Sequence, residues 1–142
     1  MNYWPINVAL EKSITNYLQT VITGSEATIY NGENNLDKQA PCVIVWVASA
    51  HEIVPRSGMY ECDTIVQTRE MPYDMPTSGS TMGNLAADAF SIFFDPNYIS
   101  NLNTNNPYSC SVVYTKQLDN KFEYREDCII NEMSFAIFAS QI

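Results

Sequence analysis

The segment from Pro41 to Arg69 restricts the fold more than any other part of the chain, because it has the pattern of a long β-hairpin. Its first arm contains an unbroken run of large apolar residues, Val43 to Val47, which is typical of a strand covered on both faces. Its second arm alternates with a period of two, which indicates a half-buried strand. One face of this arm carries Tyr60, Cys62, Thr64, Val66 and Thr68, and the other carries Glu61, Asp63, Ile65, Gln67 and Arg69. Val54 to Gly58, between the arms, contains the Pro and Gly residues that favour a turn.

Two stretches have the apolar spacing of amphipathic helices. The first runs from Pro5 to Val21, and Pro5 fits the first helical turn, where its missing N–H has no consequence. Gly24 follows this stretch and favours the end of the helix. The second stretch runs from about Ser80 to Phe94 and is ended by Asp95-Pro96. A short helical turn is expected from Tyr98 to Leu102.

Three further strands are predicted outside the hairpin. They cover Ala27 to Tyr30, Tyr108 to Thr115 and Cys128 to Ala139. Leu118 to Lys121 is expected to form the turn between the last two of these strands. Residues 70–79 contain two prolines and a glycine and are expected to form a long loop, of a kind that often carries function.

The order of these elements predicts an α+β fold in one domain over residues 1–142. We expect a mostly antiparallel sheet of about four to five strands with two helices packed on one face. Alternation along Val43 to Val47 places Val43, Val45 and Val47 on one face, and Ile44, Trp46 and Ala48 on the other. Because the helices can cover only one face, the second apolar face is expected to be buried by a second subunit.

The charge balance bears on the class of partner. The chain has 16 acidic and 7 basic residues and a net charge of −9, and its basic residues form no cluster of the kind that binds phosphate. An acidic surface can repel DNA, bind a basic partner or simply keep the protein soluble. Charged residues make up only 16% of the chain, below the typical value of about 25%, which favours extensive protein contact.

The cysteines and the chain start argue against a secreted or zinc-binding protein. The four cysteines, at positions 42, 62, 110 and 128, include no Cys-x-x-Cys pair, so reduced core residues are expected and no metal site is predicted. The first residues lack the basic start of a signal peptide, and no apolar stretch approaches the ~18 residues of a membrane span.

No motif in the sequence carries catalytic chemistry. His51 is the only histidine and is expected to be an exposed residue late in a strand. Glu61 and Asp63 share a strand face and fit solvated side chains better than a catalytic carboxylate pair. Residues 77–83 place glycine and hydroxyl groups before a helix, but no Lys follows, so a helix cap is expected instead of a phosphate site. The expectation is a protein that is not an enzyme, with no catalytic, cofactor-binding or metal-binding residues.

The layout of the whole chain resembles the tail terminator, or tail completion, proteins of long-tailed bacteriophages. The resemblance is one of size and pattern, and it begins with the amphipathic first helix. It continues through Ala40 to Val45, Ser57 to Tyr60, Asp63 to Val66, Met82 to Phe94 and Asn131 to Phe138.

This resemblance implies a structural virion protein located at the tail–neck junction and assembled in the host cytoplasm. It would form a homo-oligomeric ring, usually a hexamer, that ends the tail tube and joins it to the head–tail connector protein. DNA would pass through the lumen without specific binding, and an acidic wall suits that passage. By position, the turn at 52–58 and the loop at 70–79 are expected to contact neighbouring subunits or the tail tube protein. The residues assigned to these interfaces are Trp46, Val54, Arg56, Arg69 and Tyr73.

Three alternatives remain open. Neck and head-closure connector proteins of the same particles have a similar pattern. A small acidic inhibitor or DNA mimic would instead be a monomer or dimer with carboxylates clustered on one convex face, whereas here they are scattered from Glu11 to Glu132. A soluble ligand-binding domain that uses the aromatic-rich sheet is the third possibility.

Overall fold

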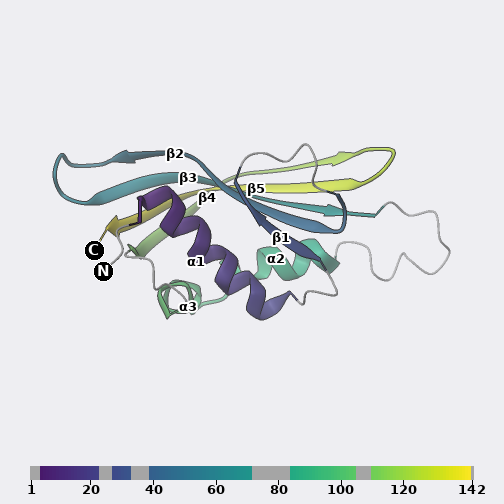
Figure 1. The fold of residues 1–142 in the computed structure, drawn as a ribbon, viewed down its shortest axis with the longest axis horizontal. Helices are drawn as coiled ribbons and strands as arrows, with labels where there is room; N and C mark the ends of the chain where they lie inside the picture. The colour runs from purple at the N-terminus through teal and green to yellow at the C-terminus, as the bar shows by residue number, and fades with distance from the viewer. Residues whose placement is uncertain (1–3, 23–26, 33–38, 72–83, 105–109, 142) are drawn as a thin grey trace.

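The computed structural model describes residues 4–22, 27–32, 39–71, 84–104 and 110–141. The described part of the chain forms three helices and five strands (Figure 1). In order, these are α1 (Ile6–Val21), β1 (Thr28–Asn31), β2 (Cys42–Glu52), β3 (Met59–Glu70), α2 (Asn84–Phe94), α3 (Tyr98–Thr104), β4 (Cys110–Tyr124) and β5 (Ile129–Gln141).

The five strands form one mixed sheet in the order β1-β2-β3-β5-β4. β1 pairs with β2 in parallel, and all the other pairs are antiparallel. β5 follows every other strand in the sequence, yet it lies between β3 and β4 (Figure 1). The predicted α+β fold with a mostly antiparallel sheet is therefore confirmed.

The predicted hairpin is formed by β2 and β3. Its register pairs Cys42 with Arg69 at one end and Glu52 with Tyr60 at the other, with one irregularity between Val47 and Ser49. The alternation of β3 is also confirmed, because Cys62 and Val66 belong to the main core while Ile65 packs on the opposite face.

The helices cover one face of the sheet (Figure 1). The sequence pattern predicts two helices and a helical turn from Tyr98 to Leu102, and the structure extends this turn into a third helix, α3. α1 begins directly after Pro5, as its pattern predicts, and ends where the N–H of Ile22 donates to the carbonyl oxygen of Leu18 at 2.8 Å. Gly24 and the first residues of the helix predicted from Ser80 lie outside the described residues.

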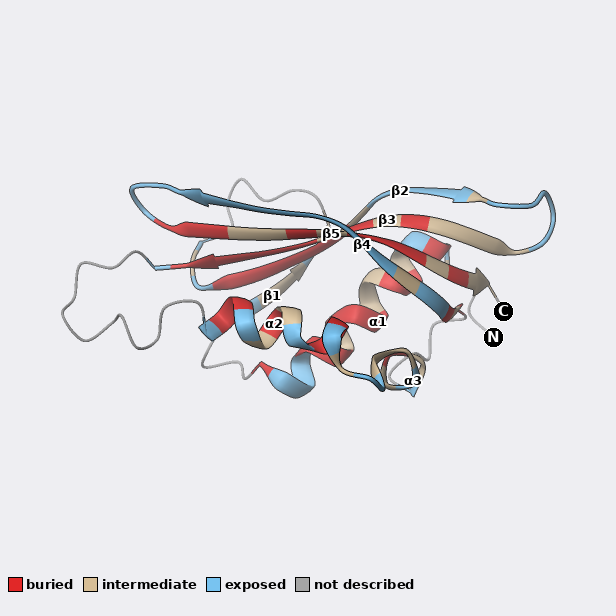
Figure 2. Cartoon of the chain, turned by 180° about the vertical axis from the view of Figure 1, so that it is seen from behind, coloured by how far each residue is buried: buried red, intermediate tan, exposed pale blue. Residues whose placement is uncertain are grey.

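The main core lies between the helices and this face of the sheet. Leu10 from α1, Val45 from β2 and Val66 from β3 are fully buried in it, and the ring of Phe135 from β5 stacks on Phe93 of α2 at 4.2 Å. Complete burial of an apolar side chain of this size is worth about 1.5–3 kcal/mol. Figure 2 shows that buried residues concentrate on β3 and β5 and on the helix surfaces that face them.

The opposite face carries a second, smaller cluster around β2. Cys42 and Ile44 are completely buried, Trp46 is 7% exposed, and Tyr30 and Ile65 pack against them. The single chain therefore already buries Ile44 and Trp46, which were expected to need a second subunit, whereas Ala48 is exposed. The expectation is wrong for Ile44 and Trp46. The alternation of β2 divides its side chains correctly between two faces, but it does not show that Tyr30 and Ile65 of the same chain pack on the second face.

The turn predicted at Leu118 to Lys121 is also wrong. β4 continues through these residues to Tyr124, and a register irregularity between Gln117 and Asp119 absorbs Leu118 as an extra residue. The chain reverses later, where the N–H of Arg125 donates to the carbonyl oxygen of Cys128 at 2.8 Å. The Asp119-Asn120 pair has the composition of a turn, but it forms only a local bond inside the strand, from the Asn120 N–H to Asp119 Oδ1 at 2.8 Å.

Candidate interaction surfaces

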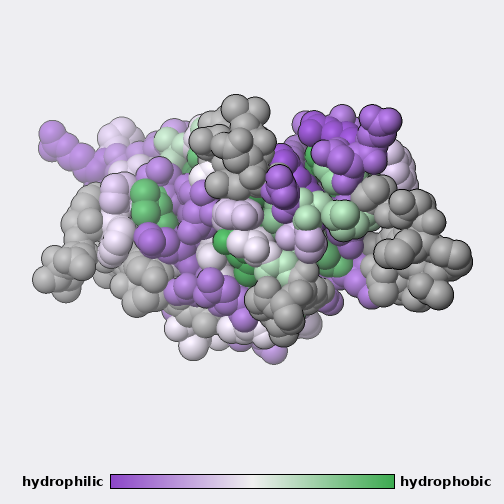
Figure 3. Space-filling model, turned by 45° about the vertical axis from the view of Figure 1, so that its right-hand side comes forward, coloured by the Kyte–Doolittle hydropathy of each residue, from purple (hydrophilic) through white to green (hydrophobic). Residues whose placement is uncertain are grey.

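Exposed apolar side chains identify the surfaces that are available for contact with other proteins. Among the described residues, half of the exposed large apolar side chains lie on the edge strand β4, and others lie in the β2–β3 turn and at the end of α2. In all they are Val21, Ile53, Val54, Met71, Phe94, Val113, Tyr114, Leu118, Phe122 and Tyr124. Figure 3 shows one face of the molecule, on which apolar patches lie within a largely hydrophilic surface.

The β2–β3 turn is held in one shape by the side chain of Glu52. Its two carboxylate oxygens accept hydrogen bonds from the backbone N–H groups of Arg56 at 2.9 Å and Gly58 at 3.0 Å. Arg56 has a φ of +62° and Gly58 a φ of +72°, so both lie in the left-handed region that glycine adopts without strain. The carboxylate compensates for the conformation of Arg56 by satisfying its N–H.

This fixed turn presents apolar side chains outward. Ile53 and Val54 are 43% and 57% exposed, and Pro55 and Arg56 beside them are exposed as well. The turn is also anchored to the sheet, because the N–H of Gln141 donates to the carbonyl oxygen of Gly58 at 2.7 Å. We call residues 53–58 the hairpin tip.

An open hollow of about 750 Å³ lies on the helix-covered side of the sheet. Its lining comes from α1, from α2 and the residues that follow it, and from single residues of β4 and β5, Asn120 and Asn131. Tyr17 and Phe90 contribute aromatic surface, and Phe94 is 63% exposed at the end of α2. Among the described residues of this lining, Asp95 is the only carboxylate. We call this feature the α2 hollow.

Helix side chains bind backbone groups at two places on the sheet, on the outer strand β4 and on β2 beyond the part that pairs with β1. On β4, the Asn103 amide accepts a bond from the Val112 N–H at 2.8 Å and donates one to the Val112 carbonyl oxygen at 3.1 Å. On β2, the Glu11 carboxyl accepts hydrogen bonds from the backbone of Val47 and Gly32, while burial raises its pKa above the ordinary value. No described strand pairs with the outer edge of β4.

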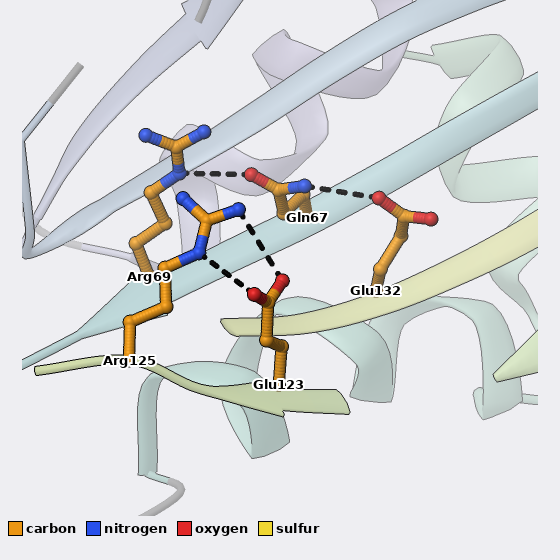
Figure 4. A network of polar contacts seen from close by, with 5 residues as sticks. All are labelled: Gln67, Arg69, Glu123, Arg125 and Glu132. Carbon is orange, nitrogen blue, oxygen red and sulfur yellow. Dashed lines mark hydrogen bonds and ion pairs between the residues drawn. The ribbon is translucent and has the colours of Figure 1, made fainter. Parts of the chain in front are cut away.

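The face away from the helices carries a polar network near the β4–β5 turn (Figure 4). Arg69 Nε donates to Gln67 Oε1 at 2.8 Å, and Gln67 Nε2 donates to Glu132 Oε1 at 2.9 Å. Glu132 also lies 3.6 Å from the ammonium group of Lys121. Beside these hydrogen bonds, Arg125 forms a two-point contact with Glu123, with N–O distances of 3.0 and 3.3 Å.

The structure separates the residues that were assigned to interfaces. Val54 and Arg56 lie together in the hairpin tip and are exposed. Trp46 is buried in the second cluster, and Arg69 is 8% exposed and bonds to Gln67 within its own chain, so these two offer little surface to a partner. Tyr73 and most of the loop at 70–79 lie outside the described residues. The α2 hollow was not predicted.

The described residues show where the candidate catalytic groups lie. His51 is exposed on β2, as expected, and its Nε2 lies 3.2 Å from the carboxylate of Glu61. The four cysteines are free and buried, as predicted, and burial raises the pKa of Cys62 to about 12, so this thiol is poorly reactive. In the described part of the chain, no group of three or more His, Cys, Asp or Glu residues is placed to hold a metal ion. None of the helices described here has both the length and the apolar character needed to cross a membrane.

No protein-family model matches the chain, and no curated protein matches it.

Proposed function

We propose that this chain is a structural subunit of a bacteriophage particle, a tail terminator that forms a ring at the end of the tail tube and joins it to the head–tail connector. The ring is built from copies of one chain, usually six, and DNA passes through its lumen. The proposal starts from the resemblance in sequence pattern that runs from the first helix to Asn131–Phe138.

The distribution of exposed apolar residues is the observation that carries this proposal. These side chains lie along the edge strand β4, in the hairpin tip and beside the α2 hollow, on several sides of a small molecule. A subunit of an assembly needs contact surfaces on several sides, because it meets two neighbours and the proteins above and below the ring. Monomeric soluble proteins rarely expose large contiguous apolar patches.

The charge of the chain also supports a ring through which DNA passes. The net charge of −9 repels phosphate and so prevents DNA from adhering to the wall of a lumen. The basic residues near the β4–β5 turn pair with carboxylates in the same chain, as Lys121 does with Glu132 and Arg125 does with Glu123.

Electron microscopy of purified particles tests the proposal. A tag on the chain is expected to label a single ring at the junction of tail and neck, and particles made without the chain are expected to have tails that are not joined to heads. A chain that is absent from purified particles would overturn the proposal. If that chain also bound a basic protein as a stable monomer, the acidic inhibitor would become the better explanation.

A further inference from the structure

In Figure 1 the hairpin tip lies at the left end of the molecule, whereas α2, which supplies much of the lining of the hollow, lies to the right of the middle. The tip adjoins Met59 at the start of β3, whereas Asn131 in the lining of the hollow pairs with Thr68 near the end of β3. At the usual rise of a strand, these two positions on β3 are roughly 30 Å apart. The tip of one molecule therefore cannot reach the hollow of the same molecule.

The two features have complementary shapes. The tip is convex and is held in place by the Glu52 carboxylate, so little flexibility is lost when it is bound. Ile53 and Val54 project from it as apolar side chains, and the hollow offers a concave surface with Phe90 and Phe94. A hollow of about 750 Å³ has room for several side chains of this size.

Each feature also presents one charged side chain, and the two are of opposite sign. Arg56 is the only charged side chain among residues 53–58, and the Glu52 carboxylate is bound to the backbone of the turn. Asp95 is the only carboxylate among the described residues that line the hollow. In a chain with a net charge of −9, most pairs of surfaces from two copies would repel each other. A contact that brings the exposed side chain of Arg56 to the carboxylate of Asp95 avoids this repulsion.

We propose that the hairpin tip of one copy docks into the α2 hollow of the next copy. Val54 then lies against Phe94, and Arg56 lies close to Asp95. Because the tip and the hollow are different surfaces of each molecule, the contact is head-to-tail, which is the type that closes into rings. The inference rests on the proposed function for the closed ring, but the contact itself can be tested on the isolated protein.

Complementation between two variants tests the contact directly. Val54→Asp removes the apolar tip, and Phe94→Asp places a charge beside Asp95 in the hollow. Both side chains are more than half exposed, so both variants are expected to fold. Native mass spectrometry and light scattering of the wild-type chain are expected to show oligomers larger than a dimer. Each variant alone is expected to associate at least about tenfold more weakly.

A mixture of the two variants gives the decisive result. The intact hollow of Val54→Asp accepts the intact tip of Phe94→Asp, and no further copy can be added, so a dimer with one copy of each variant is expected. Ser100→Asp is the matched control, because Ser100 is exposed on α3, outside β4, the tip and the hollow, and this variant should assemble as the wild type does.

Three outcomes would overturn the inference. These are a wild-type chain that stays monomeric up to its solubility limit, variants that assemble normally, and a mixture that forms no mixed dimer although each variant is folded by circular dichroism. Normal rings in particles that carry either variant would also reject this contact while leaving the proposed function intact. Conversely, mixed dimers from a chain that is absent from particles would support the contact and reject the function.

Discussion

Phe135 and Glu132 lie three residues apart on β5 and on opposite faces of one sheet. The surroundings of Phe135 are apolar, and those of Glu132 are polar. Phe135 is 1% exposed and stacks on Phe93 within a continuous apolar core. Glu132 stands among polar neighbours, where it accepts a bond from Gln67 (Figure 4). It also lies close to Lys121. One face is therefore held by packing and the other, at this end of the sheet, by hydrogen bonds between side chains of neighbouring strands.

The difference shows how each face should respond to change. When a core side chain is replaced by a smaller one, the free energy of unfolding falls with the volume of the cavity that is left, because the surrounding core relaxes only partly. A polar network depends on the pairing of its members, and the cost of breaking it rises with the burial of the group left without its partner. On the second face, we therefore expect a substitution of the buried Arg69 to lower the stability of the protein, and a substitution of the exposed Arg125 nearby to leave it unchanged.

Phe135→Ala should give the largest effect. Loss of this buried ring is expected to lower the free energy of unfolding by about 3–5 kcal/mol, since it leaves a cavity against Phe93. Urea denaturation measures the change. Phe122→Ala is the matched control on β4, because Phe122 is 68% exposed, and the change there should stay within about 0.5 kcal/mol. Equal losses in the two variants would show that the two environments do not differ as described.

Arg69→Ala should give an intermediate effect. The substitution removes the donor to Gln67 from a buried position, so we expect a loss of about 1–3 kcal/mol in the same denaturation experiment. Arg125→Ala is the control, because Arg125 makes a two-point contact with Glu123 on the surface and should unfold at the wild-type urea concentration. If Arg69→Ala were as stable as the wild type, the polar network would not stabilise this face.

Glu11→Gln should give the smallest effect, and one that depends on pH. Burial raises the pKa of Glu11 in the folded state above the ordinary value of 4.5, so as the pH increases the unfolded chain releases this proton before the folded chain does. The wild type therefore loses stability relative to the Glu11→Gln variant between pH 4.5 and the folded-state pKa. Melting temperatures of both proteins across this range measure the difference. If the melting temperature of Glu11→Gln did not rise relative to that of the wild type as the pH increased, the raised pKa of Glu11 would be contradicted.

The helix-covered face could be predicted from the sequence because its pattern is local. The spacing of apolar residues along α1 and the alternation of β3 each indicate which side chains point toward the core. The opposite face could not be predicted in this way. Gln67, Glu132 and Lys121 meet only because β3, β5 and β4 pair in one particular register, and that register joins residues as far apart as Gln67 and Glu132.

The candidate contact surface was predicted only in part, for the same reason. Val54 and Arg56 lie on either side of Pro55 in a turn that its Pro and Gly residues identify. The hairpin tip could therefore be found from the sequence. The α2 hollow combines residues from α1, α2, β4 and β5, and no sequence pattern brings Tyr17 close to Asn131. The extra length of β4 was missed because Asp119-Asn120 has the composition of a turn, whereas the irregularity at Leu118 lets the strand continue.

The position of β5 in the middle of the sheet has a consequence during synthesis on the ribosome. β3 can pair with β2 as soon as the hairpin is made, but its other edge must wait until β5 follows 59 residues after Glu70. At about 5–20 residues per second, this delay lasts roughly 3–12 s. An unpaired strand edge is a template for wrong partners, and many nascent copies of one chain would present it at the same time. The growing chain thus exposes for several seconds an edge that the finished protein keeps paired.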